Sequence, residues 1–211
     1  MGVVALVLGH SGSGKSTSLR NFEPKEVAVL NVAGKRMPFR KKLPSVENAG
    51  YPDILNALGH NSRRVYVIDD ANYLMQFANF AKAREKGYDK FVGFALDFET
   101  MLRRAAMTDD DTIVYIMMHP DYDDSGRMKP KTVGKMLDNQ LTIEGLVPIV
   151  LVAYGDESGY HFQTNDPMGV AKSPDGMFED TVIPNDLKEV DNAIREFWGM
   201  KPALVEGGDA K

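Results

Sequence analysis

Short apolar runs rich in β-branched residues recur along this chain and alternate with longer stretches that are apolar on one side only. The short runs have the length of single buried strands, and the longer stretches have the periodicity of helices. The expected strands are Val3–Leu8, Val27–Val32, Val65–Ile68, Ile113–Met118 and Ile149–Ala153. The expected helices are Lys15–Phe22, Tyr73–Lys86, Phe91–Met107 and Asp186–Trp198. This alternation predicts an α/β fold with a mostly parallel central sheet and helices on both of its faces.

The pattern changes after the last of these strands. Residues 154–164, YGDESGYHFQT, alternate apolar and polar positions around a turn that contains glycine, which predicts an antiparallel hairpin at the sheet edge. The chain has 211 residues, the size of one compact unit, so we expect one domain over residues 1–200. The small, polar residues 201–211 are expected to form a flexible C-terminal tail.

The composition excludes several classes of protein. No apolar run reaches the roughly 20 residues that cross a bilayer, so no membrane association is expected. The absence of cysteine and of an apolar leader indicates a cytoplasmic protein. The net charge of -5 provides no overall attraction to nucleic acid, so any such contact must come from local basic patches.

A phosphate-binding loop follows the first expected strand. Residues 9–17, GHSGSGKST, match the P-loop pattern G-x-x-x-x-G-K-[ST] between a strand and a helix. The glycines let backbone N–H groups converge on phosphate oxygens at the positive end of the following helix. Lys15 is expected to reach the outer phosphates, Ser16 to ligate Mg²⁺ and Thr17 to lie beside the α-phosphate. The predicted nucleotide-binding residues are Gly9, His10, Ser11, Gly12, Ser13, Gly14, Lys15, Ser16 and Thr17, with His10 facing solvent.

Two acidic residues end the third expected strand. We expect this strand to lie beside the P-loop strand, so that Asp69 holds the hydration shell of Mg²⁺ and Asp70 orients the attacking water. The alternative is a structural role, because Asp70 or Asn72 can cap the helix that follows.

The fourth expected strand ends at His119 and is broken by Pro120. A polar side chain at this strand end, next to the metal-binding strand, can hydrogen-bond the γ-phosphate and transmit its presence to the following loop. His119 is therefore the candidate γ-phosphate sensor, and a capping or surface position is the alternative.

Two basic segments are candidates for nucleic-acid contact. Residues 34–44, GKRMPFRKKLP, surround Phe39 with cations, and such mixtures suit single-stranded nucleic acid because cations bind its backbone and a ring stacks on its bases. Residues 121–138, DYDDSGRMKPKTVGKMLD, follow the candidate sensor. A solvated surface loop is the alternative for each segment. The candidate DNA-binding residues are Lys35, Arg36, Arg40, Lys41, Lys42, Arg127, Lys129, Lys131 and Lys135.

Longer blocks that span nearly the whole chain resemble a known family. They include LVLGHSGSGKSTSLRNFEPKE, NVAGKRMPF, VYVIDDANYLM, KPKTVGKMLD, AKSPDGMF and IPNDLKEVDNAIREF. The chain resembles small ATP-binding proteins that tailed bacteriophages of Gram-positive hosts encode among their replication and recombination genes. That family is similar in turn to the minimal RecA-like phage ATPases that assist single-strand annealing.

The resemblance implies a RecA-like P-loop NTPase that binds and hydrolyses Mg-ATP. It implies an oligomer, a ring or a filament, that acts on single-stranded DNA in the host cytoplasm with phage single-strand-binding or annealing proteins as partners. By the same resemblance His119 takes the place of a γ-phosphate-sensing glutamine, and the segment after it takes the place of a DNA-binding loop. Lys172 lies near the place where a neighbouring subunit's lysine reaches the bound ATP.

One departure from the RecA pattern concerns catalysis. RecA proteins keep a catalytic glutamate at the end of the strand after the P-loop helix, whereas here that strand ends LNVAGK without an acid. Either Asp70 supplies this function or hydrolysis is slow. Two other functions stay open: a nucleoside or nucleotide kinase, and a nucleotide-gated interaction protein with negligible turnover. The kinase is disfavoured because the candidate lid carries one arginine, Arg127, and is otherwise rich in lysine.

Overall fold

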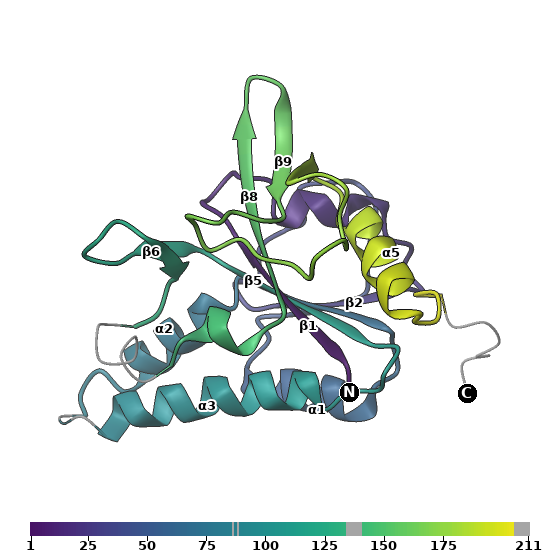
Figure 1. Cartoon of the computed structure of the whole chain (residues 1–211). Helices are drawn as coiled ribbons and strands as arrows, with labels where there is room; N and C mark the ends of the chain where they lie inside the picture. Colours follow the sequence, from purple (N-terminus) through teal and green to yellow (C-terminus); the bar gives the residue numbers. More distant parts are fainter. Residues whose placement is uncertain (86, 88, 134–140, 205–211) are drawn as a thin grey trace.

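The computed structural model describes residues 1–85, 87, 89–133 and 141–204. Within these residues, eight strands form one central sheet in the order β10-β9-β8-β1-β5-β4-β2-β3 (Figure 1). The strands are β1 (Val3–Leu8), β2 (Val27–Asn31), β3 (Ser45–Glu47), β4 (Val65–Asp69), β5 (Ile113–Met118), β8 (Ile149–Asp156), β9 (Gly159–Gln163) and β10 (Val182–Pro184). Neighbours from β3 through β8 pair in parallel, and β8, β9 and β10 pair antiparallel. The predicted α/β architecture, a mostly parallel sheet with an antiparallel edge and flanking helices, is confirmed.

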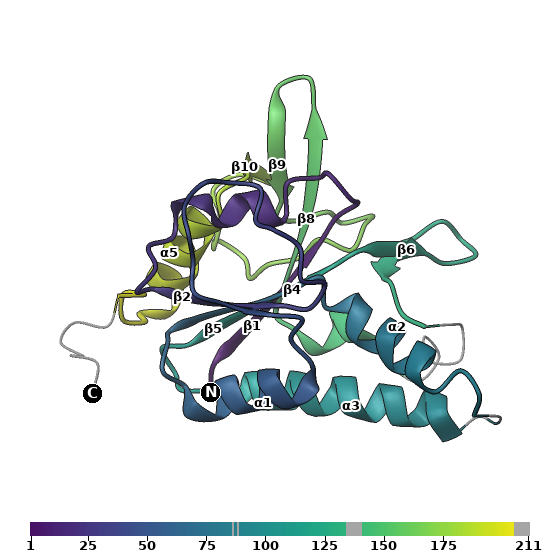
Figure 2. The same cartoon turned by 180° about the vertical axis from the view of Figure 1, so that it is seen from behind.

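Helices cover both faces of the sheet (Figures 1 and 2). One face carries α1 (Tyr51–His60), α2 (Asn72–Ala81) and α3 (Asp89–Ala106), and the other carries α5 (Leu187–Trp198) and the short 3-10 helix η1 (Ser16–Asn21). Alternate side chains of each strand enter different cores: Leu6 and Leu8 of β1 pack on the first face, and Ala5 and Val7 on the second. None of the helices in the described part of the chain combines the length and apolar character that a membrane span needs.

The strand order corrects one expectation. The strand that ends in Asp69 does not lie beside the P-loop strand, because β5 pairs with β1 on one side and with β4 on the other. Periodicity alone does not set the order of parallel strands. The arrangement brings Leu8, Asp69 and Met118 to the carboxyl edge of three adjacent strands, so the segments that follow them converge there.

Local structure also differs from the prediction in places. The segment after the P-loop forms 3-10 helix rather than α-helix, and the Ser18 hydroxyl bonds the Lys15 carbonyl there at 2.6 Å, a local bond that competes with regular α-helix. Helix α1 was not expected, although Pro52 and Asp53 mark its start and the Asp53 carboxylate accepts the Gly50 N–H at 2.9 Å. The predicted edge hairpin, β8 with β9, is confirmed, and β10 extends the sheet beyond it.

A buried arginine joins several segments at the amino edge of the sheet. Arg195 of α5 is 5% exposed, and its guanidinium pairs with Asp191 at 2.6 Å. It also donates to the backbone carbonyls of Arg64, Asp111 and Lys201 at 2.7 to 3.0 Å. Arg64 and Asp111 precede β4 and β5, so one side chain fixes the starts of two central strands and the chain beyond α5.

The chain stays packed past residue 200. Ala203 is buried, and the Arg64 guanidinium donates to the carbonyl of Pro202 at 2.8 Å. Residues 205–211 of the predicted tail lie outside the described residues.

Candidate nucleotide site

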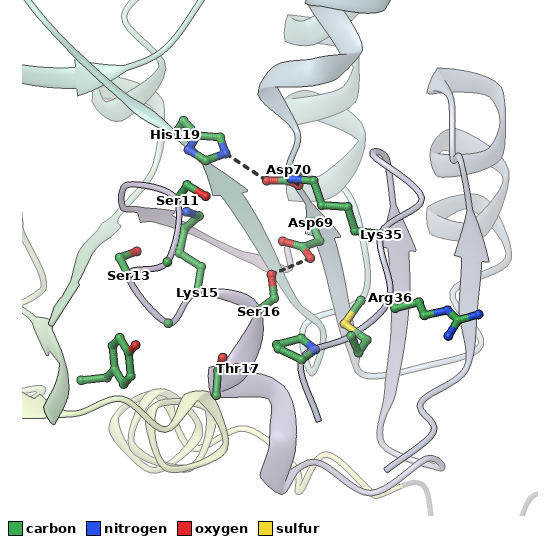
Figure 3. Close-up of a pocket in the computed structure, with 15 residues that line it drawn as sticks. Ser11, Ser13, Lys15, Ser16, Thr17, Lys35, Arg36, Asp69, Asp70 and His119 are labelled. Atoms are coloured by element: carbon green, nitrogen blue, oxygen red, sulfur yellow. Dashed lines mark hydrogen bonds and ion pairs between the residues drawn. The ribbon is translucent and has the colours of Figure 1, made fainter. Parts of the chain in front are cut away.

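A cavity of about 300 Å³ lies at the carboxyl edge, where β1, β4 and β5 end (Figure 3). It is lined by residues 11–17 of the P-loop, Lys35, Arg36, Met37, Pro38, Asp69, Asp70, His119 and Tyr160. The structure therefore brings together most of the predicted P-loop residues, both acids and the candidate sensor. Gly9 and His10 are not among the lining residues, but their backbone carbonyls accept hydrogen bonds from Lys15 Nζ.

The P-loop holds its lysine close to its own backbone. Lys15 is 6% exposed, and its Nζ donates to the carbonyls of Gly9 at 2.5 Å and His10 at 3.0 Å. Burial lowers the pKa of Lys15, and the nearby carboxylates of Asp70 and Asp69 oppose this effect. A phosphate that enters the loop would offer this ammonium a charged partner in place of two neutral carbonyls.

Two glycines of the loop adopt backbone conformations that favour glycine. Gly12 and Gly14 have φ of +81° and +90°. A methyl group at Gly14 would also lie 3.1 Å from the Tyr160 ring and 3.2 Å from the Asn185 amide. The close approach explains why this position of the loop needs glycine.

Ser16 and Asp69 form a pair with the chemistry of a magnesium site. The Ser16 hydroxyl donates to Asp69 Oδ2 at 2.9 Å, whereas Oδ1 of Asp69 is buried without a hydrogen-bond partner. Burial and the neighbouring Asp70 raise the pKa of Asp69. An unpartnered buried carboxylate oxygen beside a hydroxyl fits a hard divalent cation such as Mg²⁺. No cluster of three or more acidic or histidine side chains in the described chain could hold a metal by itself, so phosphates and water would complete the coordination of Mg²⁺.

Asp70 is engaged by two side chains. Its Oδ2 accepts a hydrogen bond from Lys35 Nζ at 2.7 Å, and its Oδ1 lies 3.3 Å from His119 Nε2, an ion-pair distance rather than an aligned hydrogen bond. Burial alone would raise the pKa of Asp70, but the contacts with His119 and Lys35 outweigh burial and lower it to about 2. A carboxylate with so low a pKa is a weak proton acceptor. The predicted role of Asp70 in orienting water remains a prediction, although the residue does line the cavity.

The capping alternative for Asp70 and Asn72 is wrong. The N-cap of α2 is Ala71, and no side chain caps this helix. The Asn72 side chain instead accepts the backbone N–H of His119 at 3.1 Å, and the Tyr73 ring meets the His119 ring edge to face at 6.0 Å. The first turn of α2 thus fixes the position of the candidate sensor.

The first basic segment does not form a separate surface. Lys35 and Arg36 line the nucleotide cavity, although the Arg36 side chain points away from the P-loop (Figure 3). Lys41 pairs with Glu23 at 2.9 Å. Phe39 packs against the core on the α5 face, so its ring does not stand free for base stacking. Arg40 and Lys42 are exposed, as a nucleic-acid contact would require.

The second basic segment begins with an unexpected hairpin of β6 (Pro120–Tyr122) and β7 (Met128–Pro130), which extends beyond the body of the domain (Figures 1 and 2). Arg127 and Lys131 are exposed, and Lys129 is partly buried. The Lys131 N–H donates to the His119 carbonyl at 2.9 Å, which ties the base of the hairpin to the candidate sensor. Lys135 lies outside the described residues.

The P-loop also contacts this hairpin. His10 is exposed, as expected, and its Nε2 lies 3.1 Å from the Tyr122 hydroxyl, with the two rings stacked at 6.1 Å. The hairpin is therefore joined both to the strand end at His119 and to the phosphate loop.

Lys172 lies apart from the cavity. Its backbone pairs with Val150 of β8 through bonds of 2.8 and 2.9 Å, and Val150 is opposite Leu6 in the interior of the sheet. Lys172 is not among the residues that line the cavity. Its predicted role toward ATP requires the site of a neighbouring subunit.

Some residues of the site were not identified from the sequence. Tyr160 falls in the predicted edge hairpin, and Asn185 lies directly before the last predicted helix. Asn185 is 2% exposed, and neither polar atom of its side chain has a hydrogen-bond partner. Lys35 had a sequence signal, because it follows the strand that lacks the expected acid.

Comparison with known proteins adds little about activity. No protein-family model matches this chain, and no curated protein matches it. One similar solved structure is a prototypical ATPase from the type III secretion system of pathogenic bacteria, with a TM-score of 0.47 and 13% sequence identity. The match covers 75% of this chain and 52% of that ATPase, so the chain spans about half the length of that protein. A likeness of this size carries no conclusion about activity.

Proposed function

We propose that this chain is a P-loop ATPase that binds Mg-ATP. The observation that carries the proposal is that Lys15, the Ser16–Asp69 pair, Asp70 and His119 come from three adjacent strand ends and face one cavity. A nucleoside triphosphate with its divalent cation is the ligand whose chemistry matches a loop of N–H groups, an ammonium, a hydroxyl and a carboxylate.

Each side chain has a defined task in the proposed reaction. Lys15 leaves the carbonyls of Gly9 and His10 and neutralises charge on the outer phosphates. Ser16 and Asp69 hold Mg²⁺, which supplies further neutralisation of the phosphate oxygens. Asp70 follows β4 and His119 follows β5, and both side chains line the cavity. In this proposal they contact the γ-phosphate and the attacking water.

A nucleotide-gated interaction protein is the second candidate, and one observation favours it. The Asp70 carboxylate is bound by Lys35 and faces His119, with a pKa of about 2, so it is a poor general base in this state. A positioned general base contributes typically ~10²- to 10⁴-fold in rate. We therefore expect slow turnover unless a ligand releases Asp70. The kinase alternative has less support, because Arg36 is the one arginine among the described residues that line the cavity.

The finer proposal is a RecA-like phage ATPase that acts on single-stranded DNA in recombination or replication. It rests on the sequence resemblance, and the β6–β7 hairpin supports it because exposed Arg127 and Lys131 lie on a segment joined to His119. In this proposal Lys172 acts across a subunit interface of a ring or filament in the host cytoplasm, with phage single-strand-binding or annealing proteins as further partners.

A single set of assays separates these functions. Binding of ATP with Mg²⁺ is measured by calorimetry, and phosphate release is measured with and without a single-stranded oligonucleotide. DNA-stimulated release supports the proposed ATPase, phosphate transfer to a nucleoside supports a kinase, and tight binding without turnover supports the gated interaction protein. Lys15→Ala should abolish binding, and undiminished binding by this variant would refute the site.

A further inference from the structure

The backbone of Lys35 is held in place beside the nucleotide cavity. Lys35 follows a turn at Gly34, whose φ is +64°, directly after β2. The buried Asn31 side chain donates to the Lys35 carbonyl at 2.7 Å and to the Glu47 carboxylate at 2.6 Å. Because β2 pairs in parallel with β4, with Asn31 opposite Asp69, this turn lies next to the acidic strand end.

The side chain of Lys35 is free to change partners. It is 60% exposed, and its Nζ bonds Asp70 at 2.7 Å while it lies 5.3 Å from the centre of the Tyr73 ring. Figure 3 shows it reaching toward Asp70 at the end of the cavity where Asp69 and His119 also lie. A lysine has a flexible four-carbon stem with three rotatable donors, so its ammonium can move to a neighbouring anion without moving the backbone.

The γ-phosphate of a bound triphosphate would enter a part of the cavity that already holds negative charge. Lys15 and Lys35 are close enough for the charge of Lys35 to lower the pKa of Lys15. The cavity already holds the carboxylates Asp69 and Asp70, and the P-loop places the outer phosphates at Lys15. A γ-phosphate here would lie against both carboxylates unless a cation stood between them.

We propose that Lys35 is a γ-phosphate ligand supplied by the same subunit, and that its ammonium moves from Asp70 to the γ-phosphate when a triphosphate binds. This inference rests on the proposed function and names how its site distinguishes ATP from ADP. A diphosphate ends before this position, so Lys35 stays with Asp70 when ADP is bound. Release of Asp70 Oδ2 then depends on the triphosphate.

The test compares two nucleotides on matched variants. Calorimetry measures the affinity of the wild-type chain, Lys35→Met, Lys35→Arg and Lys25→Met for a non-hydrolysable ATP analogue and for ADP, both with Mg²⁺. Lys25 is an exposed lysine outside the cavity and serves as the control. Lys35→Met should weaken binding of the analogue about tenfold, the size of one charge-assisted hydrogen bond, and change ADP binding by less than about twofold. Lys35→Arg should keep most of the wild-type preference for the analogue over ADP, because it keeps the positive charge. Lys25→Met should change neither affinity.

The outcomes separate this inference from the proposed function. If Lys35→Met weakens both nucleotides equally, or neither, while the wild-type chain binds both, Lys35 is no γ-phosphate ligand and the nucleotide site stands. If the wild-type chain binds neither nucleotide, the proposed function fails and this inference with it. Asp70→Asn gives a second test, because it removes the carboxylate that holds Lys35. In the chain that keeps Lys35, this substitution should raise the preference for the analogue over ADP. The rise should be smaller when Asp70→Asn is combined with Lys35→Met. An equal rise in both backgrounds would overturn the exchange of partners.

Discussion

Replacement of Asp69 and of Asp70 by asparagine, one at a time, should change the stability of the ligand-free protein in opposite directions. The two carboxylates are neighbours in sequence, but Asp70 is held by Lys35 and faces His119, whereas Asp69 is buried with one oxygen unpartnered. Asparagine keeps the size of each side chain, and it suits the left-handed backbone of Asp70, whose φ is +59°. The substitutions therefore test charge rather than packing.

The magnitude follows from the pKa of Asp70. A decrease from the ordinary value of 3.8 to about 2 corresponds to a stabilisation of about 2 kcal/mol at pH 7. The side chain is 10% exposed, so little of this is lost to solvent screening. Because the pKa is depressed in the folded state, the contribution is complete above about pH 5 and is lost as the pH falls toward 2. Asp69 has the opposite sign, since its raised pKa means that folding disfavours its charged form.

The assay is urea unfolding without nucleotide and with a chelator, so that no metal pairs with Asp69. At pH 7, Asp70→Asn should lower the free energy of unfolding by about 2 kcal/mol and Asp69→Asn should raise it. The deficit of Asp70→Asn should shrink to about half near pH 3. Equal destabilisation by both variants, or a deficit of Asp70→Asn that is independent of pH, would refute the reasoning.

Three further predictions concern the P-loop, the proposed role of Lys172 across a subunit interface, and the β6–β7 hairpin. Gly14→Ala should abolish nucleotide binding and destabilise the protein more than Gly12→Ala. Of these two positions, only at Gly14 does the added methyl group meet neighbours, at 3.1 Å. An equal loss of the free energy of unfolding in both variants would contradict this. Lys172→Ala should leave nucleotide binding intact but reduce turnover in assemblies, and wild-type activity in mixtures of any composition would exclude a role across an interface. Replacement of Arg127 and Lys131 by glutamine should lower the salt dependence of single-stranded DNA binding by about 1.4 in log–log slope, and an unchanged slope would place the DNA elsewhere.

The parts of the site that depend on a local sequence pattern could be predicted from the sequence alone. The P-loop is continuous, and Asp69 and His119 each end an apolar run, so their place at strand ends follows from periodicity. The strand order could not be predicted in this way, because parallel strands are joined by long connections. For this reason β4 was expected beside β1, whereas β5 lies between them.

The contact of Lys35 with Asp70 was missed for the same reason. A lysine among other cations in a proline-containing loop looks like part of a basic surface, and only the pairing of β2 with β4 reveals that it reaches Asp70. The packing of Phe39 against the core was not predicted, because an aromatic residue between cations gives no sign in the sequence of which side packs on the core. Helix α1 was missed although Pro52 and Asp53 mark its start. The β6–β7 hairpin was missed because each of its strands has three residues, and such short strands depend on tertiary contacts for much of their stability.

The hydrogen bonds of Arg195 restrict motion at the amino ends of two central strands. Its guanidinium ties α5 to the segments that precede β4 and β5, so the amino ends of these central strands share one rigid junction. The P-loop, the Lys35 turn and the β6–β7 hairpin all lie at the opposite ends of the strands. Nucleotide should therefore change amide hydrogen exchange at the carboxyl ends of β1, β4 and β5 and leave it unchanged around Arg64 and Asp111. The amino ends of the strands then stay fixed while the segments at the carboxyl edge move.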